Sequence, residues 1–353
     1  MIETSRRGIL LLACALLLQG QTSAPRAMME ELRSRTGAPG LSAAVAVDGK
    51  VVWAEGFGLA DLENQVPVTP ESRFRLGSVS KLFTVAAAAR LVEAGKLDLD
   101  APVQRYVPSF PEKGQAITSR QLAGHLAGIR HYVPADFQLP VKHYDRLTDG
   151  LGIFQNDALV HPPGTAYLYS SYGYNLLGAV VEGAAGKDFG AAVEELVSRP
   201  LELKSTTLDE PAKIIERRVR FYRKDADLLN EQAIDSSYKW PSAGYLSTAG
   251  DLVRFASAQV RDGYLKPETR NLLFTSQRTA TGEETGVGLG WRIGKDAAGR
   301  RFYHHGGAID GGRAFLLIYP DEGVAVAILA NLSGARFAEG EAQKLAELFL
   351  END

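Results

Sequence analysis

A serine and a lysine three positions apart, Ser78 and Lys81, are the residues whose types and spacing best suit nucleophilic catalysis in this chain. They stand at the start of an apolar segment that runs to Ala94, contains no glycine or proline and is followed by Gly95. Such a segment is typical of a buried helix that ends at a glycine cap. Because residues three apart on a helix share a face, with Cβ atoms about 5–6 Å apart, the Lys81 amine can reach the Ser78 hydroxyl.

A position at the start of a helix favours the same chemistry. The helix dipole and the unpaired backbone N–H groups disfavour an ammonium, and burial lowers the pKa of a lysine. A neutral Lys81 could then deprotonate Ser78. We expect the Ser78 backbone N–H to form one arm of an oxyanion hole, where one donor contributes about 2.7–4 kcal/mol in known cases. The alternative is that Ser78 only caps the helix.

The same S-x-x-K spacing occurs at Ser236 and Lys239, so the motif alone has low specificity. Lys239 is followed by Trp240 and Pro241, and a proline disfavours helical geometry at the residue before it. Without a helix to align them, Ser236 and Lys239 are not expected to act together. We interpret this second copy as a chance match.

A tyrosine-rich segment, 163–174, leads into another apolar helix start. A phenol whose pKa is lowered by a nearby ammonium can act as general base and acid beside a serine–lysine pair, and Tyr169 is the candidate. The alternative is that Tyr169 packs its ring and leaves its hydroxyl in water. The neighbouring tyrosines are assigned to packing: Tyr167, Tyr172 and Tyr174.

Two adjacent histidines, His304 and His305, end a strand-like run and precede Gly306 and Gly307. Successive side chains of a strand point to opposite faces, so at most one of these histidines can face a catalytic site. None of the six histidines stands in an H-E-x-x-H arrangement, and the single cysteine, Cys14, excludes an internal disulfide or a zinc–thiolate site. We therefore expect neither a metal nor an organic cofactor.

The elements around these residues predict a mixed fold. Two β-rich runs, 43–47 and 51–53, are joined by Asp48-Gly49, which is a type I′ hairpin signal. A second hairpin is expected over 314–329 and a terminal helix over 338–350, while the middle of the chain is rich in helical patterns, prolines and turns. The prediction is an α/β (α+β) fold in which an antiparallel sheet is flanked by helices and carries an inserted all-helical lobe.

The expected sheet-based lobe comprises about 25–96 and 246–353, and the helical lobe about 97–245. With 353 residues, 45% hydrophobic and 23% charged, the chain is long and apolar enough for a substantial core, which excludes a disordered protein. There are 39 Lys and Arg against 42 Asp and Glu, a net charge of −3. No basic excess is available for a phosphate backbone, so nucleic acid is not an expected partner.

Residues 1–24 have the pattern of a signal peptide. Arg6 and Arg7 precede an apolar run, 8–18, of about 11 residues, well short of the ~20 needed to span a bilayer. We expect export to the periplasm or the outside of the cell, with no stable membrane span. The segment also resembles a twin-arginine signal and, weakly, a lipoprotein box at Cys14. The alternative is a buried N-terminal helix.

The three motifs around Ser78, Tyr169 and His305, in this order, resemble those of the serine β-lactamase and penicillin-binding-protein superfamily, especially the class C β-lactamase-related hydrolases. The resemblance covers nearly the whole of 25–353. Further segments look like the family's connecting segments: 95–103, 242–252 and 288–291. Within the superfamily, the segments 125–132, 141–144 and 169–174 resemble those of the mitochondrial serine β-lactamase-like proteins of the peptidase type.

The resemblance implies a β-lactamase/transpeptidase-like fold, with a catalytic cleft between a sheet-based domain and an all-helical lobe. It implies that Ser78 forms an acyl-enzyme, that Tyr169 activates the serine or the deacylating water, and that the Ala308 backbone N–H completes the oxyanion hole. Ser171 and Gly307 are implied to lie at the substrate with His305.

Two departures from the family pattern concern the substrate. Ser171 stands where the family usually has asparagine, and His305-Gly306-Gly307 stands where β-lactamases have Lys-Thr-Gly. A lysine and a threonine suit the carboxylate of a β-lactam through charge and a hydroxyl, whereas a mostly neutral histidine and a glycine offer less of both. Efficient hydrolysis of antibiotics is therefore not expected.

The resulting hypothesis is an exported serine hydrolase that cleaves an amide or ester bond, in a peptide, through a Ser78 acyl-enzyme. One alternative is a β-lactamase or DD-peptidase that acts on β-lactams or cell-wall peptides. Another is a binding or filament-forming protein that keeps the fold without turnover. The expected partner is a peptide, ester or β-lactam small molecule, and an oligomer remains open.

Overall fold

The computed structural model describes residues 23–138 and 141–350. The predicted signal peptide thus lies outside the described residues, except for its last two positions, which begin a helix over 23–36. Cys14 also lies outside them. No helix within the described ranges is long and apolar enough to cross a lipid bilayer.

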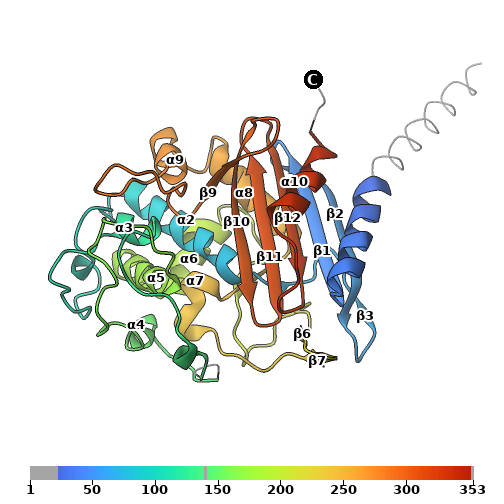
Figure 1. Ribbon diagram of the computed structural model, residues 1–353, viewed down its shortest axis with the longest axis horizontal. Coiled ribbons are helices and arrows are strands. Elements are labelled where there is room, and N and C mark those ends of the chain that lie inside the picture. The colour runs from blue at the N-terminus through green and yellow to red at the C-terminus, as the bar shows by residue number, and fades with distance from the viewer. Residues whose placement is uncertain (1–22, 139–140, 351–353) are drawn as a thin grey trace, which may run out of the picture.

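A seven-stranded antiparallel sheet forms the centre of the molecule (Figure 1). Its strand order is β3-β2-β1-β12-β11-β10-β9. The bounds, in that order, are Val66–Pro67, Lys50–Asp61, Gly40–Val47, Val324–Ala330, Gly312–Tyr319, Arg301–Ile309 and Arg292–Lys295. Segments far apart in the sequence come together where β1 pairs with β12, from Leu41 opposite Ala330 to Val47 opposite Val324. The predicted antiparallel sheet is therefore confirmed.

Both predicted hairpins are present. Asp48 and Gly49, between β1 and β2, have φ angles of 52° and 78°, the two positive values that a type I′ turn requires. The second hairpin joins β11 to β12, and the predicted terminal helix is α10, Glu339–Glu347. Local turn chemistry and alternation therefore determine this half of the fold.

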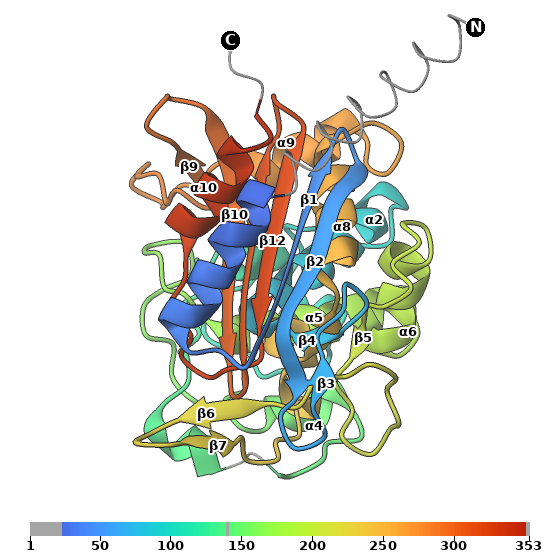
Figure 2. The same ribbon diagram turned by 90° about the vertical axis from the view of Figure 1, so that its right-hand side faces the viewer.

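Helices cover both faces of the sheet. On one face, the helix over 23–36 and α10 pack against the sheet (Figure 2), through apolar side chains that include Met29 and Leu345. On the other face lie α2, Ser80–Glu93, and α8, Ala249–Val260. Alternate residues of β12 belong to these two apolar layers, which explains why its whole sequence is apolar.

The segment between α2 and α8 has helices and helical turns, but no strand, from Val103 to Ser198 in its described part. Its helices and helical turns are η2 Val103–Arg105, α3 Ser119–Ala123, η3 Pro134–Gln138, α4 Leu147–Leu151, α5 Ser171–Ala185, α6 Phe189–Val193, η4 Glu194–Ser198, η5 Ser237–Lys239 and α7 Trp240–Ala243. A further helix, α9, Pro267–Phe274, precedes β9. Figure 1 shows most of this segment gathered to one side of the sheet.

The prediction of an all-helical insert was incomplete, because short strands also occur between Thr207 and Ser247. They are β5 Thr207–Leu208, β6 Tyr222–Lys224, β7 Leu228–Asn230 and β8 Tyr245–Ser247. β8 pairs with β5 and with β4, Phe74–Arg75, directly before Ser78. Strands of two or three residues are too short to produce an alternating pattern, so the sequence does not reveal them.

Candidate active site

Ser78 lies in a single turn of 3-10 helix, η1, Gly77–Val79, and α2 begins at Ser80. The α-helix thus starts two residues later than predicted, but the 3-10 turn still places the Ser78 side chain next to that of Lys81. The Lys81 Nζ donates a hydrogen bond to the Ser78 Oγ at 3.1 Å. Ser78 is half-buried, whereas Lys81 is fully buried. The hydroxyl is therefore accessible and its lysine partner is shielded from water.

Lys81 donates to three oxygens. Besides Ser78, its Nζ contacts the Oγ of Ser171 at 3.1 Å and the backbone carbonyl of Ser242 at 2.9 Å. Burial lowers the pKa of Lys81, and the Arg292 charge lowers it further, although Tyr169 opposes the shift. The three acceptors come from three segments of the chain, so they fix the amine beside the serine.

Tyr169 meets the same hydroxyl from the other side. Its OH donates to the Ser78 Oγ at 2.8 Å, and the Lys81 Nζ lies 4.9 Å from the centre of its ring. Burial alone would raise the pKa of Tyr169, but the Lys81 charge, hydrogen bonds to Lys81 and Ser78, and the Arg292 charge together lower it. The structure thus brings Ser78, Lys81 and Tyr169 into one hydrogen-bonded cluster.

Two glycines allow η1 to approach β10 closely. A Cβ on Gly307 would lie 1.9 Å from the carbonyl oxygen of Leu76 and 3.2 Å from the Ser78 nitrogen. A Cβ on Gly77, where φ is +50°, would lie 2.7 Å from the Ala308 nitrogen. The backbone nitrogens of Ser78 and Ala308 therefore lie close together, and Ala308 is exposed. Two such N–H groups can bind an oxyanion.

The two adjacent histidines point to opposite faces of β10, as strand alternation predicts. His305 is buried with its ring centre 6.4 Å from that of Tyr169, and its Nδ1 lies 2.7 Å from the Gly306 carbonyl oxygen. Because a carbonyl only accepts, that nitrogen carries the proton. Burial, followed by the Lys81 charge, holds the pKa of His305 well below its usual range. His304 instead stacks on Phe315 of the neighbouring strand β11.

Two histidines that the sequence reasoning missed support Tyr169. The Nδ1 of His125 accepts from the Ser170 N–H and the Nδ1 of His131 accepts from the Ser171 N–H, both at 3.2 Å. The His125 ring centre lies 4.5 Å from that of Tyr169. Burial, with the Lys81 charge, lowers the pKa of His131 to about 4 and that of His125 strongly. Both rings are therefore neutral acceptors that fix the backbone after Tyr169.

Arg292, at the start of β9, is the other missed residue. Its guanidinium carbon lies 5.7 Å from the centre of the Tyr169 ring, and its Nη2 donates to the Tyr167 hydroxyl at 3.4 Å. In the part of the chain that the structure describes, no carboxylate lies within ion-pair distance of it. The site thus has a cation available to an anionic group. Its sequence neighbours give no signal of this position.

The second S-x-x-K copy differs from the first. Contrary to the prediction, Ser237–Lys239 does form a short 3-10 helix, which ends as Trp240 and Pro241 begin α7. Proline is compatible with the first turn of a helix, so it starts α7 instead of preventing it. Burial lowers the pKa of Lys239 to about 8. Among the described residues the Ser236 hydroxyl has no hydrogen-bond partner, so the two side chains do not form a pair.

No group of three or more His, Cys, Asp or Glu side chains in the described ranges is placed to hold a metal ion. The chemistry that the geometry offers is instead nucleophilic. A half-buried hydroxyl has two potential bases within hydrogen-bond distance and two backbone N–H groups beside it.

Known proteins resemble this chain in sequence and in fold. The family model described as Beta-lactamase matches residues 25–349. The Mus musculus protein named "Serine beta-lactamase-like protein LACTB, mitochondrial" is 31% identical over 87% of this chain and 76% of that protein. The octameric penicillin-binding protein homologue from Pyrococcus abyssi has a TM-score of 0.80 at 25% identity, over 93% of this chain and 77% of that one.

A D-stereospecific amidohydrolase from Streptomyces sp. has a TM-score of 0.74 at 25% identity, over 88% of this chain and 93% of that chain. The resemblance predicted from the motifs is thus confirmed across nearly the whole of the described chain. The chain belongs to the β-lactamase family of serine hydrolases.

Proposed function

We propose that this protein hydrolyses an amide or ester bond, in a peptide, through an acyl-enzyme on Ser78. The observation that carries the proposal is that one hydroxyl oxygen lies within hydrogen-bond distance of two groups that can exchange its proton, the Tyr169 hydroxyl at 2.8 Å and the Lys81 Nζ at 3.1 Å. A hydroxyl at its ordinary pKa is a weak nucleophile, and an adjacent base is what activates it.

Tyr169 and Lys81 act as one proton-accepting unit. The lysine has three acceptors, which suits an ammonium, and an ammonium beside Tyr169 favours the phenolate. In the first step the Ser78 Oγ attacks the carbonyl carbon and its proton passes to this unit. The oxyanion is held by the N–H groups of Ser78 and Ala308. The unit then returns the proton to the departing amine or alcohol.

Water completes the cycle in the second step. The same unit takes a proton from water, the resulting hydroxide attacks the acyl carbon, and Ser78 leaves as the hydroxyl with the proton returned to it. Ser171 and His305 complete the surroundings, the first by accepting from Lys81 and the second as a neutral ring near Tyr169. Gly307 allows β10 to approach η1 closely. The proposal therefore uses all seven predicted site residues: Ser78, Lys81, Tyr169, Ser171, His305, Gly307 and Ala308.

A peptide is the proposed substrate because the site lacks the Lys-Thr pair that suits a β-lactam carboxylate. The likeness to a D-stereospecific amidohydrolase supports amide cleavage. As part of the proposal, the segment 97–245 forms one wall of the catalytic cleft and the sheet-based part forms the other. Export, to the periplasm or beyond, is also proposed and rests on the sequence of residues 1–24 alone.

β-Lactamase or DD-peptidase activity is the second candidate, favoured by the likeness to a penicillin-binding protein homologue. Nitrocefin turnover and analysis of muropeptide digests separate these activities from general peptidase action. A binding or filament-forming protein without turnover is disfavoured by the intact cluster of Ser78, Lys81 and Tyr169.

Covalent labelling with a fluorophosphonate, read by intact mass, tests the proposal. We expect one adduct on the wild-type protein and none on Ser78→Ala. Ser236→Ala, which alters the second S-x-x-K copy, is the matched control and should label like the wild type. Equal labelling of Ser78→Ala and the wild type would overturn the assignment of the nucleophile.

A further inference from the structure

Arg75, the last residue of β4, is a buried cation three residues before Ser78. Its side chain is 7% exposed, and its Nε donates to the Asp209 carboxylate at 2.7 Å. Its Nη1 donates to the backbone carbonyl of Asp310 at 2.8 Å. Asp310 directly follows β10 and lies two residues after Ala308. One side chain therefore links the segment that leads into η1 with the end of β10.

This link joins the two arms of the proposed oxyanion hole. In the described ranges, the bond from Arg75 to Asp310 is the only hydrogen bond between the segments 74–79 and 301–312. The glycines of η1 and β10 permit a close approach, but packing alone limits only how near two segments come. A hydrogen bond also limits how far apart they move. Arg75 is therefore placed to control the spacing of the two N–H groups.

The guanidinium is itself held between an aromatic ring and a carboxylate. Its carbon lies 3.8 Å from the centre of the Phe221 ring, and the buried Asp209 also accepts from Arg218 at 3.2 Å. The Asp209 backbone N–H donates to the Gly244 carbonyl at 2.8 Å. Because a guanidinium is planar and its nitrogens have fixed positions, the Asp310 carbonyl cannot move relative to Asp209 without the loss of a hydrogen bond.

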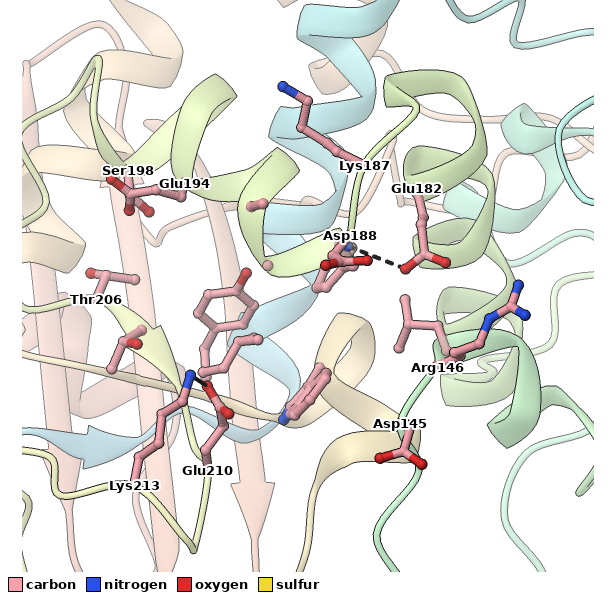
Figure 3. Close-up of a pocket in the computed structure, with 18 of the residues that line it drawn as sticks. Asp145, Arg146, Glu182, Lys187, Asp188, Glu194, Ser198, Thr206, Glu210 and Lys213 are labelled. Atoms are coloured by element: carbon pink, nitrogen blue, oxygen red, sulfur yellow. Dashed lines mark hydrogen bonds and ion pairs between the residues drawn. The ribbon is translucent and has the colours of Figure 1, made fainter.

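The residues after Asp209 form a loop whose contacts keep this carboxylate in place. Arg218 donates to the backbone carbonyls of Glu210 at 3.1 Å and Lys213 at 3.3 Å. The side chains of Glu210 and Lys213 pair at 2.7 Å, as Figure 3 shows. Asp209 therefore provides a fixed point from which Arg75 can hold the end of β10.

The enclosure of this ion pair indicates a role in geometry. Taking two charges out of water is costly, and apolar residues of similar volume often stabilise a protein equally well or better. The side chains of Arg75 and Asp209 are nonetheless almost completely buried. An apolar side chain could fill the space of Arg75, but it would have no donor for the Asp310 carbonyl.

We propose that Arg75 is a positioning residue for the oxyanion hole. It holds the end of β10 against η1, and thereby keeps the N–H groups of Ser78 and Ala308 close enough to bind one oxygen. It acts only through the backbone of these two elements. This inference rests on the proposed acyl-enzyme mechanism and adds to it a residue outside the catalytic cluster.

Arg75→Lys is the test variant. A lysine keeps the charge beside Asp209, but it lacks the planar fork that serves a carboxylate and a carbonyl together. We expect kcat for a p-nitrophenyl ester to fall about 10- to 100-fold. Because acylation and deacylation both use the oxyanion hole, KM should stay within about threefold of the wild-type value. Each rate is divided by the fraction of protein that a fluorophosphonate labels at completion, which removes the effect of unfolded protein.

Arg90→Lys is the matched control at the other end of α2. Arg90 likewise donates to a carboxylate, that of Glu93, and to a backbone carbonyl, that of Tyr264 at 3.0 Å. This variant should keep kcat within about twofold of the wild type, because it lies away from the serine. A loss of kcat as large as in Arg75→Lys would reveal a general effect of destabilisation and overturn the proposal.

The double variant Arg75→Met/Asp209→Asn keeps the test decisive if Arg75→Lys does not fold. It removes both buried charges, and the asparagine oxygen can still accept from Arg218. Its kcat should fall at least as far as that expected for Arg75→Lys. Wild-type kcat in either folded variant, while the wild type turns over the ester, would overturn this inference alone. A wild type that is not acylated on Ser78 would overturn the proposed function and this inference with it.

Discussion

Replacing Gly307 with alanine tests how the oxyanion hole is built. The new Cβ would lie 1.9 Å from the carbonyl oxygen of Leu76, an atom of the backbone that cannot rotate away. To reach ordinary contact, β10 and η1 must separate by about 1 Å or more, which moves the Ala308 N–H away from that of Ser78. A displacement of about 1 Å can reduce a rate about 10²-fold, and loss of one oxyanion donor about 10²- to 10³-fold.

We therefore expect Gly307→Ala to lower kcat for a p-nitrophenyl ester by about 10²- to 10³-fold. Overpacking should also reduce the free energy of unfolding, by about 1–3 kcal/mol. Circular dichroism at the assay temperature establishes that the variant is folded. The loss in kcat should exceed what partial unfolding explains.

Gly306→Ala is the matched control on the same strand. Its Cβ would meet the Phe315 ring at 3.3 Å, a side chain that can shift slightly, on the side of β10 away from Leu76. This variant should keep kcat within a few-fold of the wild type. A folded Gly307→Ala variant with wild-type kcat would refute the assignment of Ala308 to the oxyanion hole.

Three further predictions follow from the buried charges. Lys81→Met should lower kcat by about 10²- to 10⁴-fold. A chemical denaturation curve should nevertheless show little loss of stability, because the change removes a buried charge and keeps the side-chain volume. A strongly destabilised variant would contradict this. Because the pKa of Tyr169 is lowered, kcat/KM should rise with pH and level off below pH 10. The Tyr169→Phe variant should lose this rise. An unchanged pH profile in Tyr169→Phe would exclude the phenol as the base. Burial lowers the pKa of both His131 and His304 to about 4 in the folded protein, so between about pH 6.5 and pH 4 the unfolded chain binds more protons than the folded one. The free energy of unfolding should therefore fall as the pH drops from 6.5 to 4. Equal values from urea titrations at pH 7, 5.5 and 4.5 would contradict this.

Much of the catalytic cluster is readable from the sequence because it depends on local geometry. Ser78 and Lys81 are three residues apart at the start of one helical segment, and their 3.1 Å contact follows from that spacing. The opposite orientations of His304 and His305 follow from strand alternation in the same way. The position of Tyr169 is different, because its residue type made it a candidate base but no spacing along the chain places it beside the serine.

The residues that sequence reasoning missed act from separate segments. His125, His131 and Arg292 reach Tyr169 only after the chain has folded, and they do so through ring contacts and backbone N–H groups. No sequence spacing relates these three residues to Tyr169. A search for metal-binding histidine patterns does not detect His125 and His131. The short strands β4 and β8 were missed for a related reason, since their pairing depends on tertiary contacts and not on a repeating pattern.

Mapping the acyl-enzyme tests the central claim most directly. The protein is mixed with a p-nitrophenyl ester, quenched in acid within the first turnover, digested, and searched by mass spectrometry for the acyl group. The proposed mechanism predicts a burst of nitrophenol and an acyl group on the peptide that contains Ser78, with both lost in Lys81→Met and Tyr169→Phe. Hydrolysis without a burst or adduct, or an acyl group on any other residue, would contradict it.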